Sequence, residues 1–125
     1  MQFKINRNTR IFAIQYIFAN QYSLINMDQV KSVFINSEHD AQYLNTILTT
    51  FNENKDLITS FLKAQDVHMD NATYSILCVA LSEVIIGTGV NLVIKESMDL
   101  IDLFTTFGKN VFIRTIKSFK VKNSI

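Results

Sequence analysis

The chain has 125 residues, of which 48% are hydrophobic and 18% charged, and its formal net charge is +1. This length and apolar content predict a single domain over residues 1–125 with a core that needs no metal or disulfide, and they exclude a disordered chain. Because there are three Gly and no Pro, turn residues are scarce, so the composition predicts an all-α fold of helices joined by short polar loops.

Apolar residues at three- and four-residue spacing predict the helices of the first half. The first is expected over residues 9–22, on the stripe Ile11, Ile14, Phe18 and Tyr22. A short helix over 28–34 is more weakly signalled, and residues 37–40 have the pattern of a helix cap. The helix that follows carries the stripe Ala41, Leu44, Ile47, Leu48 and Phe51 and should end at 52–54.

The second half predicts four further helices. The first of them has the stripe Leu57, Ile58, Phe61 and Leu62. The next is capped by Asp70 or Asn71, is apolar on nearly every side as a central helix would be, and stops at Gly87 to Gly89. Asn91 is expected to cap the next helix, and the last helix presents Phe112, Ile116 and Phe119.

Charge is unevenly distributed along the chain. Before Asp28 the only charged residues are Lys4, Arg7 and Arg10, and after Asp102 the only ones are Lys109, Arg114, Lys117, Lys120 and Lys122. The segment between contains all 11 acids and only four bases. Basic ends of this kind either solubilise the chain or bind phosphates, and aromatic side chains near them could stack on RNA bases or belong to the core. Helical spacing favours the core for the aromatics.

Neither secretion nor membrane insertion is indicated. The N-terminus has no apolar run with a cleavage site, so we expect a cytoplasmic protein. Residues 74–94 are apolar, but Glu83 lies near their centre and Gly87 and Gly89 interrupt them. A carboxylate at mid-bilayer costs roughly 2.5–3.5 kcal/mol, so a buried helix followed by a turn is the better interpretation.

Five segments, in a fixed order, resemble the transcription antitermination factor NusB family. Residues 10–18 are similar to its R-x-x-A-x-Q-x-L-Y opening helix, and Asp56-Leu57-Ile58 to its D-x-L-I. Residues 80–83 resemble A-x-x-E, residues 93–100 resemble I-N-E-A-V-E-L, and Phe112-Ile113-Arg114 resembles F-V-N. The chain departs from the family at 73–78, which replaces D-R-A-I-L-R, and Lys95 and Arg114 replace asparagines, so it looks like a divergent member.

The resemblance implies a compact bundle of about seven helices in two small helical subdomains. It also implies a non-catalytic transcription antitermination or elongation factor that binds single-stranded, boxA-like RNA together with the ribosomal protein NusE and joins the transcription elongation complex. Glu83 matches the family glutamate near the partner-binding side. The expected RNA-binding residues are Lys4, Arg7, Arg10, Gln15 and Lys109.

No catalytic, metal or cofactor site is expected. Glu96 and Asp99 lie three residues apart without a nucleophile beside them, which is typical of an exposed polar face. His39 and His68 have no ligand-like spacing to Cys78, which is expected to be a small core residue.

Three alternatives remain open from the sequence. The chain could be a NusB-like protein-interaction module that has lost RNA binding. It could be an unrelated helical bundle that binds an apolar ligand, or a detached RNA-binding domain like that of some rRNA cytosine methyltransferases. The sequence leaves the oligomeric state open, a homodimer included.

Overall fold

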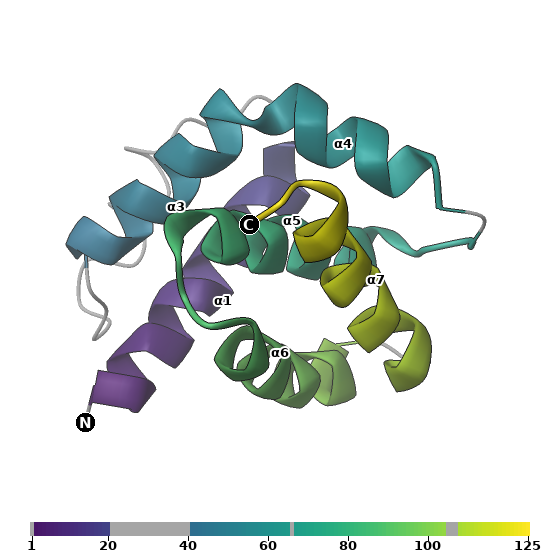
Figure 1. Ribbon diagram of the computed structural model, residues 1–125. Helices are drawn as coiled ribbons and strands as arrows, with labels where there is room; N and C mark the ends of the chain where they lie inside the picture. Colours follow the sequence, from purple (N-terminus) through teal and green to yellow (C-terminus); the bar gives the residue numbers. More distant parts are fainter. Residues whose placement is uncertain (1, 21–40, 66, 105–107) are drawn as a thin grey trace.

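The computed structural model describes residues 2–20, 41–65, 67–104 and 108–125, and this part of the chain is entirely helical (Figure 1). It contains six helices and no strand: α1 (Gln2–Asn20), α3 (Ala41–Glu53), α4 (Lys55–Lys63), α5 (Asn71–Ile86), α6 (Val90–Phe104) and α7 (Lys109–Lys122). The all-α prediction is confirmed. The predicted helix at 28–34 and the cap at 37–40 lie outside the described residues, and the count of about seven helices and the two subdomains stay predictions.

Helix α5 forms the centre of the bundle, and each of the other five described helices contacts it. In Figure 1, α3 and α4 arch above α5, α6 lies below it and α7 lies beside it. Its residues from Ser75 to Val84 are all buried, as its apolar sequence predicts. None of the described helices is both long and apolar enough to cross a membrane.

The ends of α5 follow the sequence signals closely. The side chain of Asp70 accepts a hydrogen bond from the Thr73 amide at 2.6 Å and so satisfies one of the free N–H groups of the first turn. Gly87 ends the helix with φ at 107°, a backbone conformation that glycine adopts without strain. Helix α6 then begins at Val90, so the predicted cap Asn91 lies inside its first turn instead.

Helix α1 differs from its prediction in extent and in orientation. It begins at Gln2, seven residues before the expected start. Ile14 of the predicted stripe is buried, whereas Phe18 of the same stripe is 40% exposed, and the other buried residues are Thr9, Arg10, Phe12, Ala13 and Ile17. The helix is therefore rotated so that a cation, Arg10, enters the interior.

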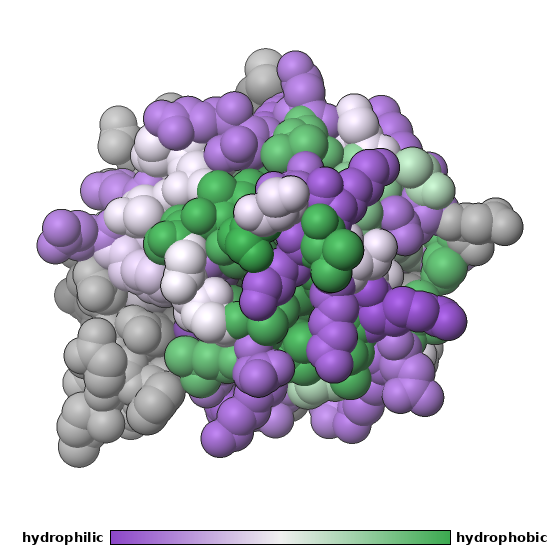
Figure 2. Space-filling model, viewed as in Figure 1, coloured by the Kyte–Doolittle hydropathy of each residue, from purple (hydrophilic) through white to green (hydrophobic). Residues whose placement is uncertain are grey.

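Helices α4 and α7 meet through aromatic packing. The rings of Phe61 and Phe119 stack edge to face with centroids 5.0 Å apart, and Phe119 is fully buried. The Lys122 ammonium lies 5.8 Å from the centre of the Phe61 ring. On the face of the molecule that is turned to the viewer in Figure 1 and Figure 2, apolar and hydrophilic side chains are interleaved.

We predict that Phe119→Ala lowers the free energy of unfolding by about 3–5 kcal/mol, because it leaves a cavity and removes the edge-to-face contact. The matched control is Val121→Ala on the same helix, at a side chain that is 79% exposed, where the change should stay within about 0.5 kcal/mol. Urea denaturation measures both. Equal losses in the two variants would contradict the proposed packing of α7.

Candidate functional site

A buried ion pair joins α1 to α5. The Arg10 guanidinium donates from Nε to both carboxylate oxygens of Glu83, at 2.8 and 3.0 Å, and the two side chains are 4% and 1% exposed. A second acid, Glu96 of α6, places its Oε2 3.8 Å from Arg10 Nη1. Burial opposes the charge of Arg10, but the hydrogen bond and the charge of Glu83 outweigh it and raise the pKa of Arg10 above its ordinary value.

Tyr43 brings α3 into the same network. Its hydroxyl donates to Glu83 Oε2 at 2.6 Å and lies 3.2 Å from the hydroxyl of Thr88, just after the end of α5. Burial, and then the neighbouring Glu83 carboxylate, raise the pKa of Tyr43 to about 12. The phenol therefore stays protonated at neutral pH and serves as a donor. We call Arg10, Tyr43, Glu83 and Thr88 the Glu83 network.

This network corrects two sequence expectations about accessibility. Arg10 was expected on an open cationic surface, but it is 3% exposed and bound to Glu83. Glu83 was expected near an open partner face, but its carboxylate faces Arg10 and Tyr43 inside the bundle. Neither side chain can meet RNA or a partner without breaking the pair, because a buried charge is stable only when it is paired.

Of the other predicted RNA residues, Arg7 and Lys109 are brought to one side of α6, because their partners Asp99 and Asp102 lie three residues apart on that helix. Arg7 pairs with Asp99 at 2.5 Å, with both side chains about half exposed. Lys109 pairs with Asp102 at 3.0 Å on the α6–α7 side. Gln15 is exposed, five residues and therefore about 140° around α1 from Arg10. The side chain of Lys4 lies outside the described residues.

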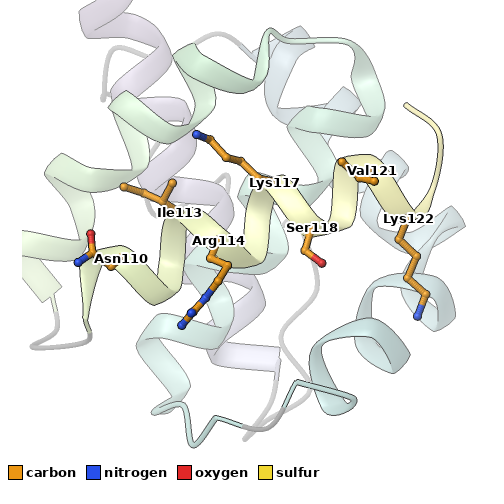
Figure 3. Close-up of a pocket in the computed structure, with 7 residues that line it drawn as sticks. All are labelled: Asn110, Ile113, Arg114, Lys117, Ser118, Val121 and Lys122. Carbon is orange, nitrogen blue, oxygen red and sulfur yellow. The ribbon is translucent and has the colours of Figure 1, made fainter.

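Four cations of helix α7 have no acidic partner among the described residues. The helix contains no acid, and no carboxylate in the described ranges lies within ion-pair distance of Arg114, Lys117, Lys120 or Lys122. A shallow hollow of about 610 Å³ runs along the helix, lined by Asn110, Ile113, Arg114, Lys117, Ser118, Val121 and Lys122 (Figure 3). We call these residues, with Lys120, the α7 surface.

Two rows at four-residue spacing make up this surface. One row is Asn110, Arg114, Ser118 and Lys122, and the other is Ile113, Lys117 and Val121. Figure 3 shows Arg114 and Lys122 leaving the helix on one side and Lys117 on the other. Because both rows mix cations with polar or apolar groups, the surface can bind a chain of phosphates and contact apolar parts of the same molecule.

The described residues contain no group of three or more His, Cys, Asp or Glu side chains that could hold a metal ion. Cys78 is fully buried, as the sequence predicts for a core residue. Burial raises the pKa of its thiol to about 12, which keeps it protonated and unreactive at neutral pH.

Sequence reasoning missed Tyr43 and Thr88, and it gave both basic ends of the chain as possible phosphate binders without separating them. Tyr43 precedes the apolar residue Ile47 by one helical turn, so its spacing indicated only the edge of a buried stripe. The cations of α7 were visible as a run without acids, but only the structure separates them from the paired cations Arg7, Arg10 and Lys109.

No protein-family model matches this chain, and no curated protein matches it in sequence.

We predict that Glu83→Gln lowers the free energy of unfolding by about 3–5 kcal/mol, because it leaves the buried Arg10 charge with only the more distant carboxylate of Glu96, 3.8 Å away. The double variant Arg10→Met, Glu83→Leu should recover most of this loss, since it removes both charges and keeps similar volumes. Chemical denaturation measures the cycle. If the double variant is as unstable as Glu83→Gln alone, the loss of stability does not come from the unpaired charge of Arg10.

The raised pKa of Tyr43 predicts a loss of stability in alkali. The folded protein holds the phenolic proton more tightly than the unfolded chain, whose pKa is 10.0. The stabilisation is therefore complete below pH 10 and is lost as the pH rises towards 12. Tyr74 and Cys78 are shifted in the same direction and add to the effect. Tyr43→Phe should show a shallower fall in urea midpoint with rising pH than the native protein, and parallel curves would contradict the assignment.

Proposed function

We propose that the protein is a non-catalytic RNA-binding factor of the NusB type, which acts in the cytoplasm in transcription antitermination with boxA-like RNA, NusE and the elongation complex. The ordered resemblance of residues 10–18, 56–58, 80–83, 93–100 and 112–114 supports the family assignment. The observation that carries RNA binding is the α7 surface, four cations on one helix without an acidic partner among the described residues.

This proposal moves the main phosphate contacts from α1 to α7. Arg10 is committed to Glu83, whereas Arg114 and Lys117 are exposed, lie three residues apart on α7 and line the same hollow from its two sides. Arg7 and Lys109 can still contribute, because both are about half exposed, but a phosphate must compete there with Asp99 and Asp102. Exposed ion pairs of this kind contribute only about 0.2–1 kcal/mol, so a phosphate can displace the carboxylate at little cost in free energy.

The number of cations limits the strength of binding. Three or four phosphate contacts to single-stranded RNA correspond to a salt slope of about −2 to −3. The face also lacks an aromatic side chain among its lining residues, so it offers no base stacking of its own. Weak binding by the chain alone therefore fits a factor that shares its RNA with a second protein.

One observation favours the alternative of a protein-interaction module without RNA binding. Both arginines of α1 are held by acids of α5 and α6, which reduces the positive potential of the helix that the resemblance assigns to RNA. In that case the α7 surface would bind an acidic protein, and RNA would not improve the association.

Fluorescence anisotropy with labelled boxA-like RNA, with and without NusE, tests the proposal. We expect Arg114→Gln, Lys117→Gln to weaken binding and to reduce the steepness of the salt dependence by about 1.4, which is roughly 0.7 for each lost contact. The matched control is Lys63→Gln, Lys95→Gln, which changes the net charge equally at exposed positions of α4 and α6.

Equal effects of the two double variants would contradict a specific α7 surface. If the native chain binds no RNA even with NusE present, while NusE itself binds, the interaction-module alternative holds instead.

A further inference from the structure

A cleft of about 190 Å³ lies between α1, α3, α4 and α5, at a distance in sequence from every residue of the α7 surface. Helix α1 contributes Tyr16, Ile17 and Asn20, α3 contributes Phe51 and Asn52, and the other two helices contribute Lys55, Thr59 and Tyr74. The cleft is thus a second concave site that the proposed RNA surface does not use.

Aromatic side chains from three helices line this cleft. Tyr16 and Tyr74 are half buried, and Phe51 is 8% exposed. All three contact the apolar core, as their helical spacing predicts, but each also borders the open volume. Aromatic side chains that line a cleft are the groups on which a flat conjugated ring can stack.

The rim of the cleft is polar and cationic. Asn20 and Asn52 are exposed, and their amides can both donate and accept hydrogen bonds. Lys55, the first residue of α4, is exposed and forms no ion pair within the described ranges.

Size restricts what can enter. Pockets for drug-sized ligands measure about 300–1,000 Å³, whereas a cavity of about 150 Å³ accepts benzene. A volume of about 190 Å³ therefore admits one planar ring system and leaves its substituents at the rim. A ligand that fits the aromatic lining, the polar and cationic rim and the small volume has a flat ring with polar edges and an anionic group attached.

We propose that this cleft binds one nucleotide, with its base against Tyr16, Phe51 and Tyr74 and its phosphate at Lys55. The base edge would exchange hydrogen bonds with the rim asparagines, as unpaired bases do in other proteins. The nucleotide can be a free mononucleotide or one unstacked residue of single-stranded RNA, and both present the same base and phosphate. The inference goes beyond the proposed function, because it uses no residue of α7.

The test is a titration of the ¹⁵N-labelled full chain, followed by NMR, with AMP, adenosine, inorganic phosphate and a short single-stranded RNA as separate probes. We expect AMP to shift amide resonances of residues 51–59 and 74 in a saturable way, adenosine to do so more weakly, and phosphate alone not to reach saturation. Saturation by AMP identifies a mononucleotide site, whereas saturation by the RNA alone identifies a site for a splayed base.

Two variants and one control separate the contacts. Tyr16→Leu keeps an apolar side chain but removes the ring, and should weaken AMP binding about 5- to 150-fold, the range measured for loss of one stacking partner. Lys55→Gln should weaken AMP and leave adenosine unchanged. The control Lys63→Gln, at the other end of α4, should change neither. Thermal melts confirm that each variant is folded, and Lys55→Gln alters only an exposed side chain.

Several results would overturn the inference. These are no saturable shift of residues 51–59 and 74 with AMP or RNA, equal binding of AMP by Lys55→Gln and the native chain, or saturation by phosphate alone that Tyr16→Leu does not alter. None of these outcomes bears on Arg114 or Lys117, so the inference can fail while the α7 surface still binds RNA.

Discussion

The pairing of Arg10 with Glu83 is the constraint around which the described helices are arranged. A guanidinium that is 3% exposed requires a carboxylate in contact, and Glu83 supplies both of its oxygens from the central helix. Because Tyr43 donates to the same carboxylate, α1 and α3 are both oriented by one acid of α5. Apolar packing alone tolerates small rotations of a helix, whereas a hydrogen-bonded charge pair fixes the face that α1 turns inward.

The same constraint decides where positive charge remains available. Glu83, Glu96 and Asp99 lie on α5 and α6 and compensate the arginines of α1. Arg114, Lys117, Lys120 and Lys122 of α7 have no such neighbours in the described part of the chain, so uncompensated positive charge gathers on that helix. Net charge by segment, which is all that a sequence provides, counts both ends of the chain as basic. The structure makes them unequal, because both arginines of α1 are paired with acids, whereas on α7 Lys109 is paired and these four cations are not.

The sequence predicts elements whose signals are local and leaves undetermined what depends on distant partners. The cap at Asp70, the stop at Gly87 and the buried row Phe112, Ile116 and Phe119 follow from short-range backbone and periodicity rules, and the structure confirms them. The rotation of α1 could not be predicted from periodicity, since it requires knowing that Arg10 meets an acid 73 residues away. The sequence could not separate the α7 cations from the paired cations of α1 for the same reason. A basic residue appears equally available in sequence whether it faces solvent, as Arg114 does, or an acid.

Helix α4 determines whether the two candidate surfaces are independent. Its first turns contribute Lys55 and Thr59 to the cleft, and its later turn contributes Phe61 to the contact with Phe119 of α7. Ile58, Phe61 and Leu62 are buried, so the helix is held by the core rather than by either surface. Substitutions at its exposed positions therefore change the cleft without moving α7, whereas loss of Phe61 would disturb both. The separation of the surfaces thus depends on the packing of one nine-residue helix.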